Sequence, residues 1–128
     1  MSETEPQVWL QRAESNLRLA ERGNVEGVLL EDLCFEAQQA AEKALKALLL
    51  EFSGDFPRVH SIGLLLERLD KHVSIPDSIK EAVELTDYAV QLRYPGHYAP
   101  VTEAEYQRAI VLATRTLDWV KQNLTREK

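Results

Sequence analysis

The sequence predicts an all-α protein, an up-and-down bundle of four long helices and one short helix. Three observations support this prediction. Apolar residues recur every three or four positions along most of the chain, which is the period of a helix buried on one side. No segment alternates apolar and polar residues as a strand does. Gly and Pro residues fall between the periodic segments, as expected for short loops that join antiparallel helices.

The composition indicates one globular domain. A chain of 128 residues can bury a core but is too short for two ordinary domains. We expect a single domain over residues 1–128, with its core at about 7–124. The single cysteine, Cys34, cannot form an internal disulfide, and we expect it to be a core residue of a cytoplasmic protein. No apolar run has transmembrane length and the N-terminus is acidic and polar, so we expect neither a membrane span nor a secretory signal.

The stretch 33–52 is expected to be the central helix. Its apolar residues cover an unusually broad arc of the helical wheel, which suggests packing on more than one side. The alanines of this arc form a seam of small residues that another helix could approach closely. The arc consists of Leu33, Cys34, Ala37, Ala40, Ala41, Ala44, Leu45, Ala47, Leu48, Leu49 and Phe52. The opposite side consists of Glu36, Gln39, Glu42, Lys43 and Lys46. We expect Glu42 and Lys43 to be solvated, and Lys43 and Lys46 could meet an acidic partner. Gln38 falls beside the apolar arc, where we expect it to reach water at the edge.

The flanking helices have recognisable ends. The first helix is expected to open at 4–7, with Thr4 as its cap, and to end at Gly23. The central helix should begin near 28–31 and end at the segment 53–55. A short third helix is expected over about 61–71, and its inner face consists of Ile62, Leu65, Leu66 and Leu69.

The last two helices follow a break at 74–77. Asp77 is a good cap for the fourth helix, which should run up to Arg93. Its expected apolar line consists of Ile79, Ala82, Val83, Thr86, Ala89 and Val90. The segment 102–105 has the pattern of a capping box and should start the last helix. The inner face of that helix is expected to consist of Tyr106, Ile110, Ala113, Leu117, Val120 and Leu124.

The segment 93–98 is the candidate chemical site, because it gathers an Arg, a His and two Tyr. Arg93 offers a planar fork for phosphate, and His97 can transfer protons near neutral pH. Together they could cleave a phosphodiester by attack of a ribose 2′-hydroxyl, while Tyr94 and Tyr98 stack on bases. The alternative is structural: a helix end whose Arg is favoured by the helix dipole, followed by a Tyr-rich loop packed on the bundle.

Other kinds of site find less support in the sequence. His60, His72 and His97 lack the spacing of a metal site, and no glycine-rich phosphate loop is present. We therefore expect neither a metal nor another cofactor. The net charge of −6 argues against a general nucleic-acid-binding surface, although a local RNA site is compatible with it.

Several segments together resemble the HEPN domain (higher eukaryotes and prokaryotes nucleotide-binding). The most specific is Cys34–Leu50, with the sequence CFEAQQAAEKALKALLL. Pro57–Ile62 and Leu92–Gly96 support the resemblance, as does the early Trp9. The similarity extends from about residue 7 to residue 124.

The resemblance implies a fold, partners and an activity. HEPN domains are helical bundles that usually form homodimers, and short prokaryotic members are commonly encoded beside a minimal nucleotidyltransferase. Such pairs act as toxin–antitoxin modules in which the HEPN protein is an RNase, and the partner can adenylylate a Tyr near the motif. Catalytic members use an Arg and a His at the dimer interface without a metal. On that pattern Arg93 and His97 are the catalytic pair, and Tyr94 or Tyr98 is the modified residue.

Two further functional readings remain open. Three residues separate Arg93 from His97, which is shorter than the spacing in catalytic members. This spacing favours a non-catalytic module that binds a nucleotide or a partner, and a purely structural helical oligomer is the third reading. His60 lies where the family often has a His before the third helix, and we expect it to cap or pack. A central helix with so broad an apolar arc also suggests a surplus of apolar surface that a homodimer would cover.

Overall fold

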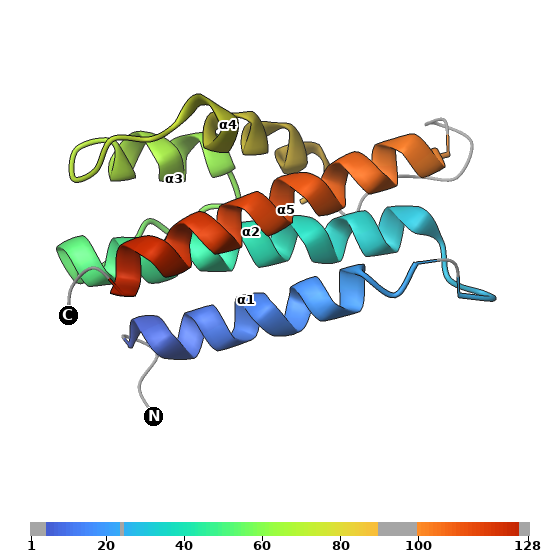
Figure 1. Cartoon of the computed structure of the whole chain (residues 1–128), viewed down its shortest axis with the longest axis horizontal. Helices are drawn as coiled ribbons and strands as arrows, with labels where there is room; N and C mark the ends of the chain where they lie inside the picture. Colours follow the sequence, from blue (N-terminus) through green and yellow to red (C-terminus); the bar gives the residue numbers. More distant parts are fainter. Residues whose placement is uncertain (1–4, 24, 90–99, 126–128) are drawn as a thin grey trace.

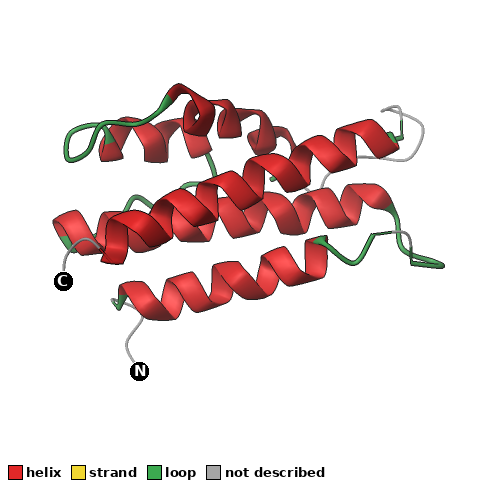
Figure 2. Cartoon of the chain, viewed as in Figure 1, coloured by secondary structure: helices red, strands yellow, loops and turns green. Residues whose placement is uncertain are grey.

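The chain forms a bundle of helices in the computed structural model, which describes residues 5–23, 25–89 and 100–125 (Figure 1). Within these ranges all regular structure is helical and no strand is present (Figure 2). The predicted all-α class is therefore confirmed. Within the described ranges, no helix combines the length and apolar character needed to cross a membrane.

The helix α2 (Leu30–Ser53) lies at the centre of the bundle. It packs against α1 (Pro6–Ala20), α3 (Ile62–Leu69), the 3-10 helix η1 (Glu81–Tyr88) and α5 (Glu103–Thr125), as Figure 1 shows. The prediction of a central helix is confirmed, since the apolar arc is buried and only Phe52 is half-buried. The alanines of the small-residue seam are fully buried, and so is Cys34.

Specific backbone contacts fix the ends of the long helices. Gly54 ends α2 in the left-handed conformation, with φ of 78°, and its N–H donates to the carbonyl of Leu50 at 2.9 Å. The predicted capping box of α5 is confirmed. The Thr102 hydroxyl accepts from the Glu105 N–H at 3.1 Å, and the Glu105 carboxylate accepts from the Thr102 N–H at 2.8 Å.

The start of α1 differs from the prediction. Its N-cap is Glu5, which makes no side-chain capping bond, while Thr4 lies outside the described residues. The end of α1 is held by α5 instead. The Tyr106 hydroxyl donates to the carbonyl of Ala20 and accepts from the N–H of Gly23. A residue far away in the sequence therefore closes the first helix.

The fourth helical segment is tighter than expected. It consists of α4 (Asp77–Lys80) followed directly by the 3-10 helix η1. A 3-10 helix has three residues per turn, so side chains three positions apart share one face. Ile79, Ala82 and Leu85 are consequently buried, and the prediction that Val83 faces inward is wrong, since it is 48% exposed.

The caps of the short helices also differ from each other. Ser61 caps α3, because its hydroxyl accepts from the N–H of Leu64 at 3.2 Å. Asp77 does not cap α4 as predicted. Pro76 takes the N-cap position and Asp77 is the first helical residue, where its charge still lies at the positive end of the helix dipole.

The central helix does not have the surplus apolar surface from which a dimer was predicted, and that reason for a dimer is wrong. The bundle of one chain already covers the apolar arc of α2 from Leu33 to Leu50. Among the described residues, the large apolar side chains that stay exposed lie on other parts of the chain. They are Leu19, Val25, Val28, Leu29, Val83 and Val111.

Candidate functional site

The predicted site at 93–98 lies outside the residues that the structure describes. This applies to Arg93, Tyr94, His97 and Tyr98. The described chain stops at residue 89, just after η1, and resumes at residue 100, shortly before α5. The roles assigned to these four residues therefore stay predictions.

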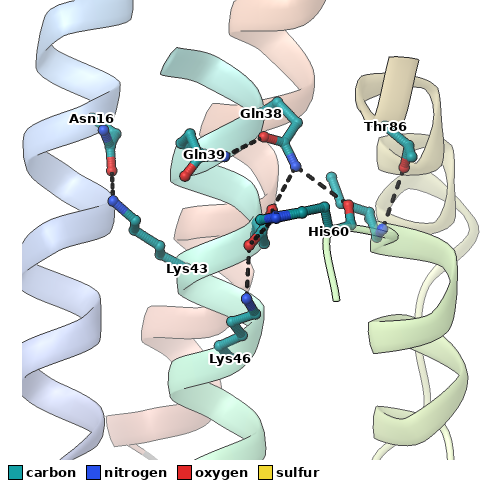
Figure 3. Close-up of polar contacts among 9 residues, drawn as sticks. Asn16, Gln38, Gln39, Lys43, Lys46, His60 and Thr86 are labelled. Carbon is teal, nitrogen blue, oxygen red and sulfur yellow. Dashed lines mark hydrogen bonds and ion pairs between the residues drawn. The ribbon is translucent and has the colours of Figure 1, made fainter. Parts of the chain in front are cut away.

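Within the described residues, the polar cluster at the middle of α2 is the most unusual chemical feature. It consists of Gln38, Glu42, Lys46 and His60, and we call it the Glu42 cluster. Gln38, Glu42 and Lys46 are 0%, 3% and 7% exposed, although they are polar or charged. Figure 3 shows Gln38 and Lys46 on α2 and His60 on the segment that leads into α3.

Glu42 is the hub of this cluster. Its carboxylate accepts from Lys46 Nζ at 2.7 Å and from Gln38 Nε2 at 2.8 Å. His60 Nδ1 lies 3.1 and 3.2 Å from its two oxygens. Because residues four apart lie on the same side of a helix, Gln38, Glu42 and Lys46 form one line along α2. The spacing of the helix therefore assembles three of the four members before any tertiary contact is made.

The loop between α2 and α3 supplies the fourth member and covers the cluster. Gln38 Nε2 also lies 3.4 Å from the carbonyl oxygen of His60, which fixes the backbone there. Phe56, on the same loop, places its ring 5.2 Å from Lys46 Nζ, close enough for a cation–π contact. The rings of Phe56 and of Trp9 on α1 pack edge to face, with a centroid separation of 5.1 Å. The cluster thus joins α1, α2 and the loop.

Glu42 is ionised despite its burial. Burial alone would raise the pKa of its carboxyl group. The hydrogen bonds from Lys46 and Gln38, the charge of Lys46 and the hydrogen bond from His60 outweigh burial and lower the pKa. An ionised carboxylate only accepts hydrogen bonds, so the proton of neutral His60 must be on Nδ1. The other ring nitrogen, Nε2, then carries a lone pair.

The His60 side chain is open to solvent. It is 72% exposed, whereas the Glu42 carboxylate that holds it is almost fully buried. A buried carboxylate that orients an exposed imidazole is an arrangement that prepares a His for proton transfer. His60 is not the cap of α3, because Ser61 takes that position, and its ring bonds to Glu42 while it stays open to solvent.

The predicted environment of Glu42 and Gln38 is also wrong. Glu42 was expected to be solvated and Gln38 to reach water at the edge of the arc, but both are buried, and so is Lys46 on the same line of α2. Their burial follows from the loop that crosses α2, which a helical wheel does not contain. The signal that could have found them is the spacing of four between Gln38, Glu42 and Lys46, which allows mutual pairing.

A second polar group lies between α1 and α2. Lys43 Nζ donates to Asn16 Oδ1 at 2.9 Å, and Asn16 Nδ2 donates to Glu36 at 2.6 Å. Burial lowers the pKa of the Lys43 ammonium group, while the charge of Glu36 opposes that effect. Lys43 is half-buried, so its predicted full solvation is also wrong.

Cavities are also present at other places in the described part of the chain. One of about 450 Å³ lies between the end of α2 and α3, and the side chains of Arg68, Lys71 and His72 contribute to its lining. Another, of about 420 Å³, lies between η1 and α5, where Arg108 pairs with Glu84 and Glu81. In the described part of the chain, no three His, Cys, Asp or Glu side chains come together as ligands for a metal would.

Comparison with known proteins identifies close structural relatives. The HEPN domain model matches residues 6–123. The crystal structure of TT1696 from Thermus thermophilus is 36% identical, with a TM-score of 0.79, and the alignment covers 91% of this chain and 96% of that one. The crystal structure of ST0689, an archaeal HEPN homologue, is 35% identical, with a TM-score of 0.73. That alignment covers 96% of this chain and 98% of the other.

No curated protein matched the chain significantly. The family model nevertheless spans all the helices of the bundle up to the last turn of α5. The two solved relatives share both the fold and about a third of the residues over nearly the whole chain. On these grounds, the chain belongs to the HEPN-domain family.

Proposed function

We propose that this HEPN protein is a metal-independent endoribonuclease that acts as a homodimer. We further propose that it belongs to a two-gene, toxin–antitoxin-type module with a minimal nucleotidyltransferase. The observation that carries the proposal is the family match over residues 6–123, a range that includes the Arg, His and Tyr residues of segment 93–98.

The proposed chemistry is cleavage by the ribose 2′-hydroxyl. A base removes the proton from that hydroxyl, the oxygen attacks the adjacent phosphorus, and the bond to the 5′-oxygen breaks. Arg93 would stabilise the charge on the phosphate, and His97 would take or give a proton. Tyr94 and Tyr98 would stack on bases, and one of them would be the residue that the partner modifies.

RNA cleavage by the purified protein tests this proposal. The assay contains EDTA and omits the partner, and it compares the parent with Arg93→Ala and His97→Ala. Arg18→Ala and His72→Ala are the matched controls, since both side chains are exposed and lie outside the motif. We expect cleavage by the parent and both controls and its loss in the two motif variants. An inactive parent that remains folded would overturn the proposal.

The same variants make a prediction in cells. If cleavage of RNA causes toxicity, expression of the parent without its partner should arrest growth, and Arg93→Ala should abolish the arrest. Co-expression of the nucleotidyltransferase should relieve it. Growth arrest that persists at equal expression of Arg93→Ala would contradict the assignment of this residue.

A second candidate function is a non-catalytic module that binds a nucleotide or a partner protein. Two observations favour it: the short Arg93–His97 spacing and the acidic surface at the ends of the neighbouring helices. The exposed acidic residues there are Glu81, Glu84, Asp87, Glu103 and Glu105. Arg108, an exposed cation among them, is already paired with Glu81 and Glu84, so this surface offers little to a polyanion. Intact RNA together with capture of the nucleotidyltransferase would support this function.

A further inference from the structure

We propose that His60 is a second acid–base residue of this protein, oriented by Glu42, and that it transfers the proton of a ribose hydroxyl. The proposal rests on the proposed action on RNA. It starts from the contrast within the Glu42 cluster, where a side chain that is 72% exposed is anchored to a carboxylate that is 3% exposed.

The anchor fixes which nitrogen of His60 is available. In the neutral ring, the ionised carboxylate of Glu42 accepts the hydrogen bond from Nδ1–H, and Nε2 then presents a lone pair. A general base needs that form of the ring, because it must accept a proton from a hydroxyl group. The carbonyl of His60 is also held by Gln38. Both the ring and its backbone are therefore positioned by the buried face of α2.

The Glu42 carboxylate is positioned to hold both the neutral and the protonated ring of His60. With the neutral ring, Lys46 and Glu42 form an ion pair within the cluster. When Nε2 takes a proton, the ring becomes an imidazolium whose Nδ1–H still donates to the Glu42 carboxylate. The negative charge is already in place, so the cluster needs no rearrangement to stabilise the new positive charge. Lys46 bonds to the same carboxylate, with Nζ 2.7 Å from Oε2, so its positive charge opposes this effect.

The other described histidine lacks these features. The ring of His72 stacks on Phe52 with a centroid separation of 5.6 Å, and no carboxylate of the described residues lies in contact with it. His72 is exposed like His60, so exposure alone does not distinguish the two. The distinguishing feature is the buried carboxylate, which makes His72 a matched control.

The reaction itself has a place for a second histidine. Cleavage by the 2′-hydroxyl requires removal of one proton from that hydroxyl and delivery of one proton to the departing 5′-oxygen. In the balanced step, the 2′-oxygen loses its proton to Nε2 of His60, the new O–P bond forms, and the P–O bond to the 5′-oxygen breaks. The departing 5′-oxygen takes a proton from solvent water, and His60 then returns its own proton to the solvent.

Single-turnover cleavage of RNA over a range of pH tests the proposal. The parent is compared with His60→Ala, Glu42→Gln and the control His72→Ala, each checked for its fold by circular dichroism. General acid–base catalysis contributes about 10²–10⁴-fold, so His60→Ala should lose about 10²-fold or more, with an altered pH profile. Free imidazole should restore part of the activity, since removal of an exposed ring leaves room for it. Loss of the partner that orients a metal-bound His costs about 10–100-fold, and we expect a loss of similar size for Glu42→Gln, where a carboxylate orients a free His.

The outcomes separate this inference from the proposed function. If the parent cleaves RNA and His60→Ala cleaves equally well, the inference fails while the proposed function stands. If His60→Ala is slow but keeps the pH profile and gains nothing from imidazole, His60 is structural and the inference again fails. If the folded parent does not cleave RNA, the proposed function fails, and the inference fails as well because it depends on that function. Slow cleavage with a changed pH profile and rescue by imidazole supports the inference.

Discussion

At the scale of single residues, the fold accepts a buried charge where it would be expected to exclude one. Glu42 lies on the polar side of the helical wheel of α2 but is buried, and its burial is compensated by three partners, Lys46, Gln38 and His60. A buried ion pair is often no more stable than an apolar replacement, but removal of one partner leaves the other uncompensated. Glu42 and Lys46 should therefore behave as a unit.

Replacement of Glu42 by Gln should destabilise the protein in a pH-dependent way. Breaking a buried ion pair costs about 3–5 kcal/mol, and we expect the lower end because Gln retains some hydrogen bonds. The pKa of Glu42 is below its ordinary value of 4.5 in the folded state. The stabilisation by its charge is thus fully present above about pH 4.5 and is lost as the pH falls through the lower folded value.

Urea unfolding at a series of pH values measures this effect. The difference in free energy of unfolding between the parent and Glu42→Gln should shrink on acidification below about pH 4.5. Glu67→Gln is the control, because Glu67 is exposed and outside the cluster. If the difference in free energy of unfolding between the parent and Glu42→Gln stays constant down to about pH 2, the assignment of an ionised carboxylate is contradicted.

Tyr106→Phe should weaken the junction of α1 and α5. The Tyr106 hydroxyl is the hydrogen-bonding partner of both the Ala20 carbonyl and the Gly23 N–H, and the side chain is 3% exposed. Loss of a partner for buried polar groups costs about 1–3 kcal/mol. The midpoint of thermal unfolding should therefore be lower for Tyr106→Phe than for the parent. Hydrogen exchange at Gly23 should also become faster, and unchanged protection there would contradict the role of the hydroxyl.

At the scale of elements, local sequence controls where the helices begin and end. Gly54 ends α2 with a positive φ, and Ser61 and the Thr102–Glu105 box begin α3 and α5. The interior of the fourth segment follows tertiary packing instead. Its 3-10 geometry places Ala82 and Leu85 in the core.

Two glycine substitutions should have opposite effects. Gly54→Ala places a side chain at φ of 78° with no atom within 4 Å of its Cβ, so the cost is the backbone conformation, about 1 kcal/mol. Gly63→Ala improves helix propensity within α3 by up to about 1 kcal/mol. Its Cβ would lie 3.3 Å from Cγ2 of Val83, which is 48% exposed and free to rotate outward.

Chemical denaturation of the two glycine variants tests this pair. We expect the midpoint to fall for Gly54→Ala and to rise for Gly63→Ala. A variant Gly54→Asn should lose less than Gly54→Ala, because Asn adopts the left-handed conformation more readily. Equal destabilisation by Ala at both positions would show that backbone conformation does not control the end of α2.

At the scale of the whole molecule, the homodimer remains a prediction that rests on family membership. One chain already covers its core, so assembly would have to use the exposed apolar residues elsewhere. We expect sedimentation equilibrium to give a mass about twice the 14.6 kDa of one chain. The midpoint of thermal unfolding should also rise with protein concentration, because association stabilises the folded state. A mass of one chain at all concentrations would contradict the dimer.

Local patterns in the sequence were enough to predict the helical class, the central helix and most helix ends. These features depend on local physics: the period of apolar residues, the capping box at Thr102 and the conformational freedom of glycine at the end of α2. The family resemblance also came from the sequence, and the HEPN match and both solved relatives confirm it.

Which polar residues are buried depends on the tertiary structure instead. Glu42 and Lys46 lie on the polar side of a helical wheel, and their spacing of four with Gln38 allows pairing but does not by itself predict burial. The loop that carries Phe56 and His60 crosses that side of α2, removes water from it and supplies a partner for the carboxylate. Burial is a property of what packs over a residue, and long-range contacts of this kind are absent from any local pattern.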